Sequence, residues 1–424
     1  MGDYENVILG GGLAGMAAYS ALSNSNSRLI IEKTDRLLGH CKSHELGEYS
    51  FDEGVHVCHS TNKAWLRKLN LKDAHFIKSS DVRNIYKGKW IGYPIQNNLC
   101  DLDTKDRDLA YKQIKACSEF SVTHHNNYED WLINTYGEFL YKNFYRKFTL
   151  KYWRSEPSEL GLDWLAGRLL PVEMNLIDKG LEGSNSSQAV FNSYFYPRKG
   201  GFQSLFKDMI KDIPKQDTLF DSEIISIDPM NSNVILKNEK KYNFKRLIYT
   251  LPLPQISKFI HNFPEDLALL LNKLRYTQLF SLAVKIPEIN SHDFPDWFYV
   301  YDENIDISRV FNVSKASNNN KHLVLQCETF RRDDEICNRS NIQESMMHGL
   351  KKLFPESEIE NLKFYVTEFA YIVPLECNKE IINKVNDYLR RFNIISAGLY
   401  GLWKYRWSDQ TYTDTHDLIS NLSG

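Results

Sequence analysis

Residues 7–15 read Val7-Ile8-Leu9-Gly10-Gly11-Gly12-Leu13-Ala14-Gly15, and a second apolar run, residues 29–31, ends at Glu32. The order of a short β-rich run, three glycines and a stretch of small helix-forming residues predicts strand, turn and helix. In such a turn Gly10 allows the tight bend, Gly12 lets backbone N–H groups approach a pyrophosphate, and Gly15 lets the helix pack closely on the strand. Glu32, at the tip of the next parallel strand, can accept hydrogen bonds from a ribose diol. We therefore expect a Rossmann-type dinucleotide site rather than a glycine-rich turn without a ligand.

The composition excludes several classes of protein. The chain has 424 residues, a net charge of -2 and 25% charged residues, so it lacks the basic character of a nucleic-acid-binding protein. Its seven cysteines are scattered and form no C-x-x-C pair, which argues against a disulfide framework and a structural zinc site. The N-terminus does not resemble a signal peptide, and no window approaches the roughly eighteen apolar residues of a membrane helix. We expect a cytoplasmic protein with no metal, no nucleic-acid partner and no membrane span.

Aromatic residues are abundant, at 13% of the chain, with 24 tyrosines and 8 tryptophans. Two explanations stay open. One is a tyrosine-rich surface encoded by an A+T-rich genome, which the many Asn and Lys residues also suggest. The other is a pocket lined by aromatic faces.

The segment after the second strand narrows the choice of dinucleotide. It reads Glu32-Lys33-x-x-Arg36-x-x-Gly39 and continues into residues 51–56, Phe-Asp-Glu-Gly-Val-His. This continuation resembles the flavoprotein superfamily of amine oxidases, in which the acidic residue precedes a glycine pair and an FD-x-G-x-H segment near the flavin ring. His40 stands here in place of the second glycine of the pair. The resemblance implies FAD rather than NAD.

The remaining periodicity predicts the fold class. Residues 104–148 have a helical pattern, and alternating runs at 280–286, 297–301, 309–313, 322–328 and 364–371 predict antiparallel strands. Pro94 is expected to leave residues 91–99 as an extended segment outside any central strand. We predict an α/β fold with a Rossmann-type FAD-binding domain, a helical insert and an antiparallel substrate-side sheet. The expected boundaries are 1–82, 190–262 and 386–424 for the FAD-binding domain, 100–189 for the helical domain, and 83–99 and 263–385 for the sheet.

Four further segments carry a more specific resemblance. They are Tyr-Pro-Ile-Gln-Asn-Asn at 93–98, Asp-Trp-Leu-x-x-Arg at 163–168, Trp297-x-Tyr299 followed by Arg309, and Trp-Lys-Tyr at 403–405 with Asp-Gln at 409–410. In this order the chain resembles the UDP-galactopyranose mutases, and it is more similar to their eukaryotic-type branch than to the common bacterial one. The resemblance runs from Asn6 to the C-terminal helix.

The resemblance assigns expected roles to residues of this chain. The catalytic set is His56, beside the flavin N5, with Arg168 and Arg309, which would hold a diphosphate. The expected substrate-binding residues are Gln96, Trp153, Asn192, Trp297, Tyr299, Tyr371 and Tyr405. The expected cofactor-binding residues are Gly10, Gly12, Leu13, Ala14, Gly15, Glu32, Lys33, Gly39, Gly398, Asp409 and Gln410. The chain departs from the family at Leu399, where the family has an arginine, and at Val55, where it has a glycine.

The resemblance also implies a chemistry. Reduced FAD would attack the anomeric carbon of a nucleotide sugar through its N5 and expel the nucleoside diphosphate, so that the sugar ring can reclose as a furanose. The expected partner is a UDP-hexose, the expected product a galactofuranose nucleotide for polysaccharide biosynthesis, and the expected assembly a homo-oligomer. The arginines and tyrosines would keep the diphosphate bound by charge-assisted hydrogen bonds.

Two other functions remain open from the sequence. One is an FAD-dependent oxidoreductase of the amine oxidase or protoporphyrinogen oxidase kind, which would need an apolar tunnel and an electron acceptor rather than paired arginines. The other is a flavin-binding protein without catalysis, for which the absent arginine at Leu399 is the argument.

Overall fold

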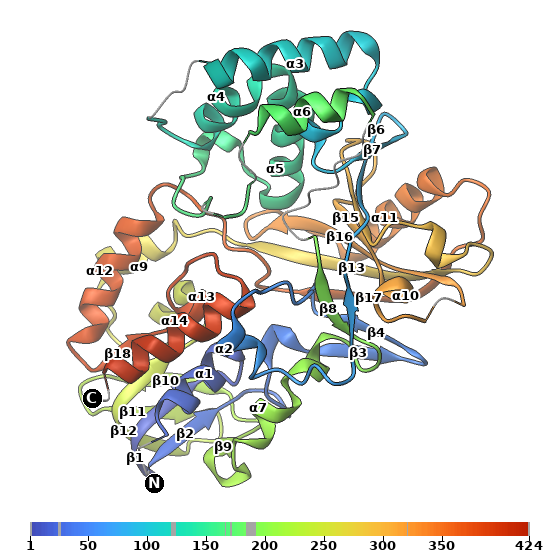
Figure 1. The fold of residues 1–424 in the computed structure, drawn as a ribbon. Helices are drawn as coiled ribbons and strands as arrows, with labels where there is room; N and C mark the ends of the chain where they lie inside the picture. The colour runs from blue at the N-terminus through green and yellow to red at the C-terminus, as the bar shows by residue number, and fades with distance from the viewer. Residues whose placement is uncertain are drawn as a thin grey trace.

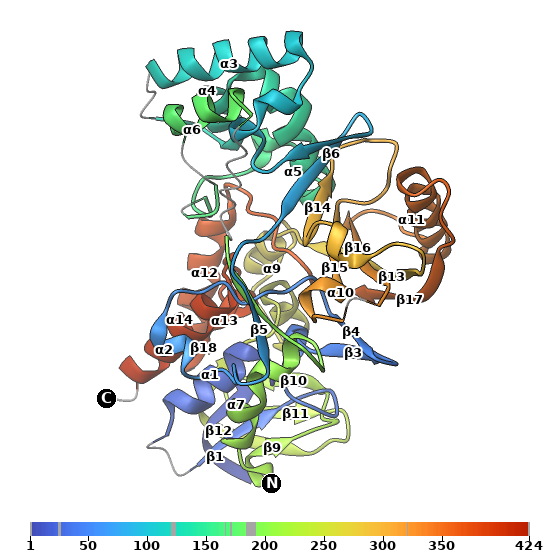
Figure 2. The same ribbon diagram turned by 45° about the vertical axis from the view of Figure 1, so that its right-hand side comes forward.

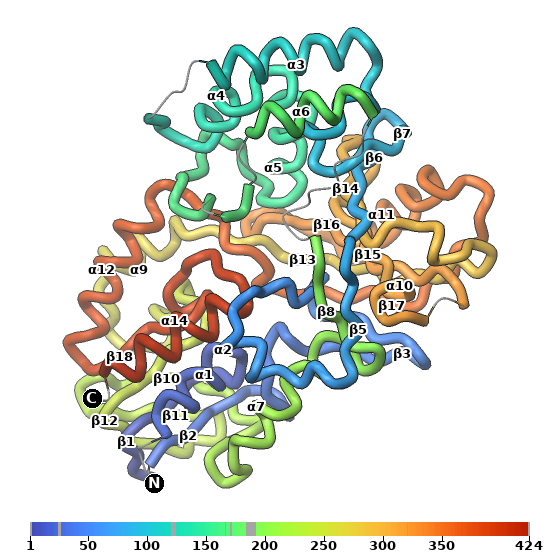
Figure 3. Tube along the Cα trace, viewed as in Figure 1, coloured from blue at the N-terminus to red at the C-terminus, as the bar shows by residue number. Residues whose placement is uncertain are grey.

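Two seven-stranded sheets and a group of helices form the body of the protein, shown as a computed structural model in Figure 1. The structure describes residues 2–23, 27–119, 124–165, 167–169, 172–183, 192–319 and 321–422. Figures 1 and 2 show the first sheet at one end and helices α3 (Thr104–Glu119), α4 (Tyr128–Leu140) and α6 (Met174–Leu181) at the other, with the second sheet between them. Both termini lie at the end that holds the first sheet, as the tube in Figure 3 shows.

The first sheet has the order β10-β11-β12-β1-β2-β9, and β18 pairs with β12. Its strands are β1 (Gly2–Leu9), β2 (Arg28–Ile31), β9 (Thr218–Leu219), β10 (Ile224–Asp228), β11 (Asn233–Leu236), β12 (Lys241–Tyr249) and β18 (Ile394–Ser396). Strands β1, β2, β9, β12 and β18 are parallel, whereas β10 and β11 add an antiparallel edge. Helix α1 (Leu13–Ala21) connects β1 to β2. The predicted strand, turn, helix and strand of a Rossmann-type unit is therefore confirmed.

Both faces of this sheet are covered, which explains its continuous apolar strands. Ile8 packs with residues of α1 and α14 (Ser408–Asn421) on one face, whereas Val7 and Leu9 pack with residues of α12 (Asn378–Arg390) on the other. Side chains alternate between the two faces of a strand, so one apolar run supplies two separate cores.

The second sheet has the order β17-β13-β16-β15-β14-β6-β7. Its strands are β6 (Val82–Tyr86), β7 (Lys89–Gly92), β13 (Thr277–Ile286), β14 (Trp297–Val300), β15 (Arg309–Asn312), β16 (Leu323–Arg332) and β17 (Glu360–Thr367). The prediction of an antiparallel sheet is correct for the other pairs but wrong for β14 and β6, which are parallel. These two strands are far apart in the chain, so no hairpin fixes their relative direction.

The helical pattern predicted between residues 104 and 148 is confirmed by α3 and α4, although residues 120–123 lie outside the described residues. Helix α4 continues through a π-helical turn at Tyr141–Tyr145 into α5 (Arg146–Trp153). The prediction that residues 91–99 are extended is wrong in part. A cis peptide bond joins Tyr93 to Pro94, and the chain then forms a 3-10 turn at Ile95–Asn97. Local i to i+3 hydrogen bonds satisfy the backbone there, which a proline alone does not reveal.

The other helices and strands connect these parts. They are β3 (Ser43–Leu46), β4 (Tyr49–Asp52), α2 (Lys63–Leu66), β5 (Ala74–Ile77), β8 (Tyr194–Pro197), α7 (Lys207–Lys211), α8 (Ile256–Phe259), α9 (Glu265–Leu271), α10 (Val313–Ala316), α11 (Arg339–Leu353) and α13 (Gly398–Gly401). Within the described ranges, none of the helices is long and apolar enough to cross a membrane. All seven cysteines are free thiols. The predicted division of the chain into three domains stays a prediction.

Candidate active site

The glycine turn has the backbone that a dinucleotide site needs. Gly10 has a φ of 98°, which only glycine adopts readily, and a Cβ added to Gly15 would lie 1.9 Å from the carbonyl oxygen of Gly10. Gly12 caps the N-terminus of α1, and within 4 Å of a Cβ added there only the Cα of Gly39, at 3.8 Å, would be met. The helix thus packs directly on the strand and leaves space beside its N-terminal N–H groups. These residues fit the pyrophosphate of a bound FAD.

Glu32 shapes this turn from within. Its Oε2 accepts a hydrogen bond from Gly11 N at 2.7 Å, and its Oε1 accepts from Thr34 N and Oγ1 at 2.9 and 2.7 Å. A carboxylate has about four acceptor sites, two on each oxygen. Both sites of Oε1 are used by Thr34, so one site, on Oε2, remains for a ribose hydroxyl. Lys33, the next residue in the predicted cofactor set, is exposed.

The C-terminal part of the predicted cofactor set lies close to α1. A Cβ added to Gly398 would lie 2.2 Å from the Cβ of Ala14, so α13 can approach α1 only because residue 398 is glycine. Asp409, in the first turn of α14, accepts a hydrogen bond from Ser60 Oγ at 2.5 Å. Gln410 instead reaches Arg168, since its Oε1 accepts from Arg168 Nη2 at 3.2 Å. Gln410 therefore lies where the cofactor and substrate sets meet.

Three tyrosine rings connect the two predicted diphosphate arginines. The guanidinium of Arg168 lies 4.7 Å from the ring centre of Tyr405, whose centre is 5.7 Å from that of Tyr371. Tyr371 lies 5.2 Å from Tyr152, and the guanidinium of Arg309 lies 5.7 Å from the Tyr152 ring. These residues come from four distant parts of the chain. The structure therefore brings together both arginines and both tyrosines that the sequence proposed for a diphosphate.

Arg168 is held by neutral oxygen acceptors and aromatic faces. It donates to the carbonyl oxygens of Trp164 at 2.9 Å and Tyr405 at 3.2 Å, and Trp407 lies 4.9 Å from its guanidinium. Burial lowers the pKa of Arg168, although Tyr405 and Asp409 act in the opposite direction. An anion bound here would compensate the cost of removing this charge from water.

Arg309 forms a buried ion pair with Glu328. Glu328 Oε2 accepts from Nε at 2.7 Å and lies 2.6 Å from Nη2, while Oε1 accepts from the backbone N–H of Val55 at 2.7 Å. Burial works against the charge on Arg309, but the carboxylate of Glu328 outweighs it and raises the pKa of Arg309 well above its usual range. Glu328 thus engages one edge of the guanidinium, and it also fixes the turn that carries His56.

His56 packs against an aromatic ring beside this pair. Its imidazole stacks on Phe202, with ring centres 5.1 Å apart and planes 17° apart. Burial lowers the pKa of His56 to about 4, and the charges of Arg309 and His40 act in the same direction. At neutral pH the side chain is therefore a neutral imidazole, able to donate and accept hydrogen bonds but not to act as a cation.

Asp52 positions Phe202 and, through it, His56. Its Oδ1 accepts hydrogen bonds from Ser43 Oγ at 2.6 Å and Phe202 N at 2.9 Å, and its Oδ2 accepts from Tyr196 Oη at 2.9 Å. Burial raises the pKa of Asp52 to about 6 even though these three donors lower it. The carboxyl group fixes the Gly-Gly-Phe turn at residues 200–202 under the histidine.

The three aromatic residues at positions 153, 297 and 299 of the predicted substrate-binding set occupy different environments. Trp153 is 3% exposed, lies 4.5 Å from Trp164, and its indole Nε1 is buried with no hydrogen-bond partner among the described residues. Tyr299 faces Arg309 in register on β14 and β15. Trp297 instead packs in the core, 5.7 Å from Tyr194. The structure therefore groups Trp153 and Tyr299 with the arginines more closely than Trp297.

The two predicted polar substrate contacts also differ. Gln96 is 3% exposed, and its Oε1 accepts a hydrogen bond from Tyr145 Oη at 2.9 Å, which fixes its amide in one orientation. Asn192 is exposed, and its backbone oxygen accepts from Ser80 N at 2.9 Å. Leu399, at the position of the absent family arginine, packs against the core under the first sheet.

Sequence reasoning missed Tyr152, Glu328, Phe202 and Trp407. Tyr152 lies four residues after Phe148, and the two rings stack with centres 4.7 Å apart, so helical spacing is a signal for the burial of Tyr152. The pairing of Arg309 with Glu328 follows from the register of β15 and β16, which one sequence does not determine.

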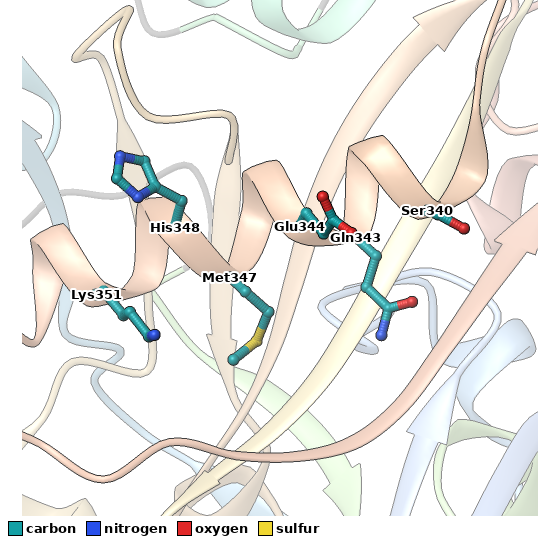
Figure 4. Close-up of a pocket in the computed structure, with 6 residues that line it drawn as sticks. All are labelled: Ser340, Gln343, Glu344, Met347, His348 and Lys351. Carbon is teal, nitrogen blue, oxygen red and sulfur yellow. The ribbon is translucent and has the colours of Figure 1, made fainter.

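A surface depression on α11 is unrelated to these residues. Figure 4 shows its lining residues, which all lie on this single helix: Ser340, Gln343, Glu344, Met347, His348 and Lys351. Figures 1 and 2 show α11 on the outer side of the second sheet. The candidate active site is the arginine–tyrosine cluster instead, where polar and aromatic groups from several elements converge.

Comparison with known proteins identifies the family. A family model described as flavin containing amine oxidoreductase matches residues 13–373. The chain belongs to this family. Membership confirms the prediction of a flavoprotein, and the geometry of the glycine turn fits the dinucleotide form of the cofactor, FAD.

Individual relatives add to this result. The chain is 24% identical over 187 residues to a probable UDP-galactopyranose mutase of Klebsiella pneumoniae, an alignment that covers 42% of this chain and 48% of that protein. It therefore spans about half the length of this relative. A crystal structure of reduced UDP-galactopyranose mutase superimposes with a TM-score of 0.89 at 20% identity and covers 99% of this chain and 94% of that one.

Other flavoproteins share the fold at greater distance. A putative protoporphyrinogen oxidase from Exiguobacterium sp. 255-15 has a TM-score of 0.76 at 13% identity, covering 99% of this chain and 98% of that one. A fatty acid isomerase from P. acnes has a TM-score of 0.69 at 14% identity, with 99% and 98% covered. The similarity to UDP-galactopyranose mutases inferred from the sequence is confirmed at the level of the fold.

Proposed function

We propose that this protein is an isomerase of the UDP-galactopyranose mutase type, which interconverts the pyranose and furanose forms of a nucleotide sugar. The row of Arg168, Tyr405, Tyr371, Tyr152 and Arg309 carries this proposal, because two guanidinium groups at the ends of a row of tyrosine side chains suit a diphosphate. An oxidoreductase acting on an amine or a carbon–carbon bond would have no use for such a row.

In this proposal the chain's own residues bind, orient and shield the substrate. Arg168 and Arg309 hold the diphosphate throughout, so that the leaving group stays in place for the return step. Glu328 engages Nε and Nη2 of Arg309, and in this proposal Nη1 is the atom that binds the diphosphate. Trp153 donates its unpaired indole N–H to a substrate oxygen, and the surrounding aromatic rings exclude water.

When bound, FAD in its reduced form would supply the nucleophile, N5, for the anomeric carbon. His56 lies in the turn that the family places beside this atom, and its low pKa keeps it neutral. A neutral imidazole does not compete with the arginines for the anionic diphosphate. The proposal also includes FAD in its reduced form as the active state and a UDP-hexose as the substrate. It further includes a homo-oligomer. It also includes a cytoplasmic location, which the seven free thiols support.

A second candidate is an FAD-dependent oxidoreductase. It is favoured by the family description and by the fold shared with a putative protoporphyrinogen oxidase. The two candidates differ in their ligand, because only the mutase requires a nucleoside diphosphate.

Binding of UDP to the FAD-loaded protein separates them. We expect Arg168→Ala and Arg309→Ala each to weaken UDP binding at least tenfold while the FAD content stays unchanged. Arg339→Ala, an exposed arginine at the start of α11, serves as the matched control and leaves the affinity as in wild type. Unchanged UDP affinity in both site variants would contradict the diphosphate assignment.

A further inference from the structure

Lys151 lies beside the site but has no role in the function proposed above. Its Nζ donates hydrogen bonds to the carbonyl oxygens of Val300, Asp302 and Ile305 at 2.8 Å each, and of Ile307 at 2.9 Å. An ammonium group has three protons, so four oxygens share them. The arrangement is that of a cation surrounded by backbone carbonyls.

The four carbonyls lie close together in the chain: Val300 ends β14, and the other three residues belong to the loop that follows it. This loop, residues 301–308, joins the end of β14 to Arg309 at the start of β15, so it connects the two strands that carry Tyr299 and Arg309. Val300, Ile305 and Ile307 are at most 5% exposed, so their carbonyls have little access to water. Without a proton donor in the centre, the four oxygen dipoles would repel one another.

The same lysine belongs to the helix that supports Arg309 from the other side. Helix α5 also carries Tyr152, the residue after Lys151, whose ring lies 5.7 Å from the Arg309 guanidinium. The backbone oxygen of Lys151 also accepts a hydrogen bond from Ser308 Oγ at 3.2 Å, next to Arg309 in the chain. Lys151 therefore connects the helix and the loop between which Arg309 is placed.

The charge on Lys151 is central to this contact. Burial lowers the pKa of Lys151 to about 8 and Lys147 acts in the same direction, while Asp306, Asp302 and Glu303 favour the charged form. The side chain is thus mostly protonated at neutral pH, and the hydrogen bonds to four carbonyls favour that form further.

We infer that Lys151 is a positioning residue whose ammonium group serves as a built-in monovalent cation. It fixes the loop at residues 301–308 and thereby the direction of the Arg309 guanidinium. This inference rests on the proposed function only in taking Arg309 as a ligand for the diphosphate; the carbonyl cage itself is independent of it.

The inference is tested directly by removing the Lys151 ammonium group and supplying a cation from solution in its place. Lys151→Ala opens the cage, whereas Lys151→Met fills the space with a neutral chain of similar length. UDP affinity and thermal unfolding of the FAD-loaded variants are measured at equal ionic strength in tetramethylammonium, potassium or methylammonium chloride. Tetramethylammonium is too large for the cage, and the other two cations fit four carbonyl oxygens.

We expect Lys151→Ala to bind UDP at least tenfold more weakly than wild type in tetramethylammonium, and to recover at least threefold of this loss in methylammonium or potassium. Its unfolding temperature should rise with the same cations. Lys151→Met should bind as weakly and show no recovery, and wild type should not respond to the choice of cation.

Three results would overturn the inference. The first is a UDP affinity of Lys151→Ala equal to that of wild type, and the second is the same recovery of UDP affinity by cations in Lys151→Met. The third is a folded Lys151→Ala whose UDP affinity and unfolding temperature are both independent of the cation. Failure of both variants to fold would also contradict it, because the lysine would then serve the fold and not the placement of Arg309. If wild type binds no UDP, the proposed function fails, yet the cation dependence of the unfolding temperature still decides whether the cage exists.

Discussion

Glu328→Gln tests whether the buried ion pair organises the site. Both oxygens of the Glu328 carboxylate accept hydrogen bonds, one from Arg309 and the other from Val55 N, and the side chain is 0% exposed. Glutamine has the same shape but only one acceptor, because its other terminal atom is an NH2 donor. Either Arg309 or the Val55 N–H must then face a donor.

The structure sets the size of the effect. Removing one partner of a buried ion pair costs about 3–5 kcal/mol, because the remaining charge stays buried and uncompensated. Arg309 is only 13% exposed, so water cannot replace the lost carboxylate. Since glutamine keeps one acceptor, we expect the free energy of unfolding to fall by about 3 kcal/mol, at the lower end of this range. We also expect UDP affinity to fall about tenfold, or about 1.4 kcal/mol.

Urea unfolding of the oxidised, FAD-loaded protein measures the first effect, and UDP titration the second. Glu360→Gln is the matched control, because Glu360 pairs with Lys285 at 3.6 Å on the same sheet but has a side chain that is 54% exposed. An exposed pair contributes less than about 1 kcal/mol. If Glu328→Gln changes stability no more than this control, the ion pair does not organise the site.

Three further predictions concern the cofactor turn and the histidine. Gly15→Ala places a Cβ 1.9 Å from the Gly10 oxygen and should yield protein without FAD; flavin absorbance at wild-type stoichiometry would contradict this. Because the pKa of Asp52 is raised to about 6, its contribution to stability is present below about pH 4 and lost as the pH rises through 6, by about 3 kcal/mol. Asp52→Asn should remove this component from urea unfolding measured between pH 4 and 7, and an unchanged pH profile would refute it. The pKa of His56, lowered to about 4, predicts that its imidazole stays neutral from pH 7 down to about 5. The NMR signal of this imidazole is assigned by its loss in His56→Gln, and titration of that signal near pH 6.5 would contradict the prediction.

The sequence predicts the site best where the role of a residue depends on its own backbone conformation or on close packing within one motif. Gly10 and Gly15 each have a conformational or packing reason to be glycine, and the structure contains both the left-handed backbone and the close helix–strand approach. The arginines could be proposed only through resemblance, because Arg168 and Arg309 meet through three tyrosine rings that come from distant segments.

The rest depends on tertiary contacts that leave no local pattern. The pairing of Arg309 with Glu328 needs the register of two strands, and the parallel pairing of β6 with β14 needs their relative position in space. The resemblance gives Trp297 as a substrate-binding residue, and this stays a prediction. Its side chain packs in the core, and an alternating strand pattern does not reveal what covers each face. Lys151 is similar, since nothing in its neighbours along the chain predicts four carbonyl acceptors from another segment.

The most direct test of the proposed function is exchange between pyranose and furanose forms by the purified yellow protein. A panel of nucleotide hexoses is incubated with the enzyme in its oxidised form and after reduction by dithionite, and products are separated by chromatography. The account predicts a furanose nucleotide from a UDP-hexose with reduced protein only, with no net consumption of reductant. Absence of any furanose product, together with substrate-dependent bleaching of the oxidised flavin, would contradict it and establish an oxidoreductase.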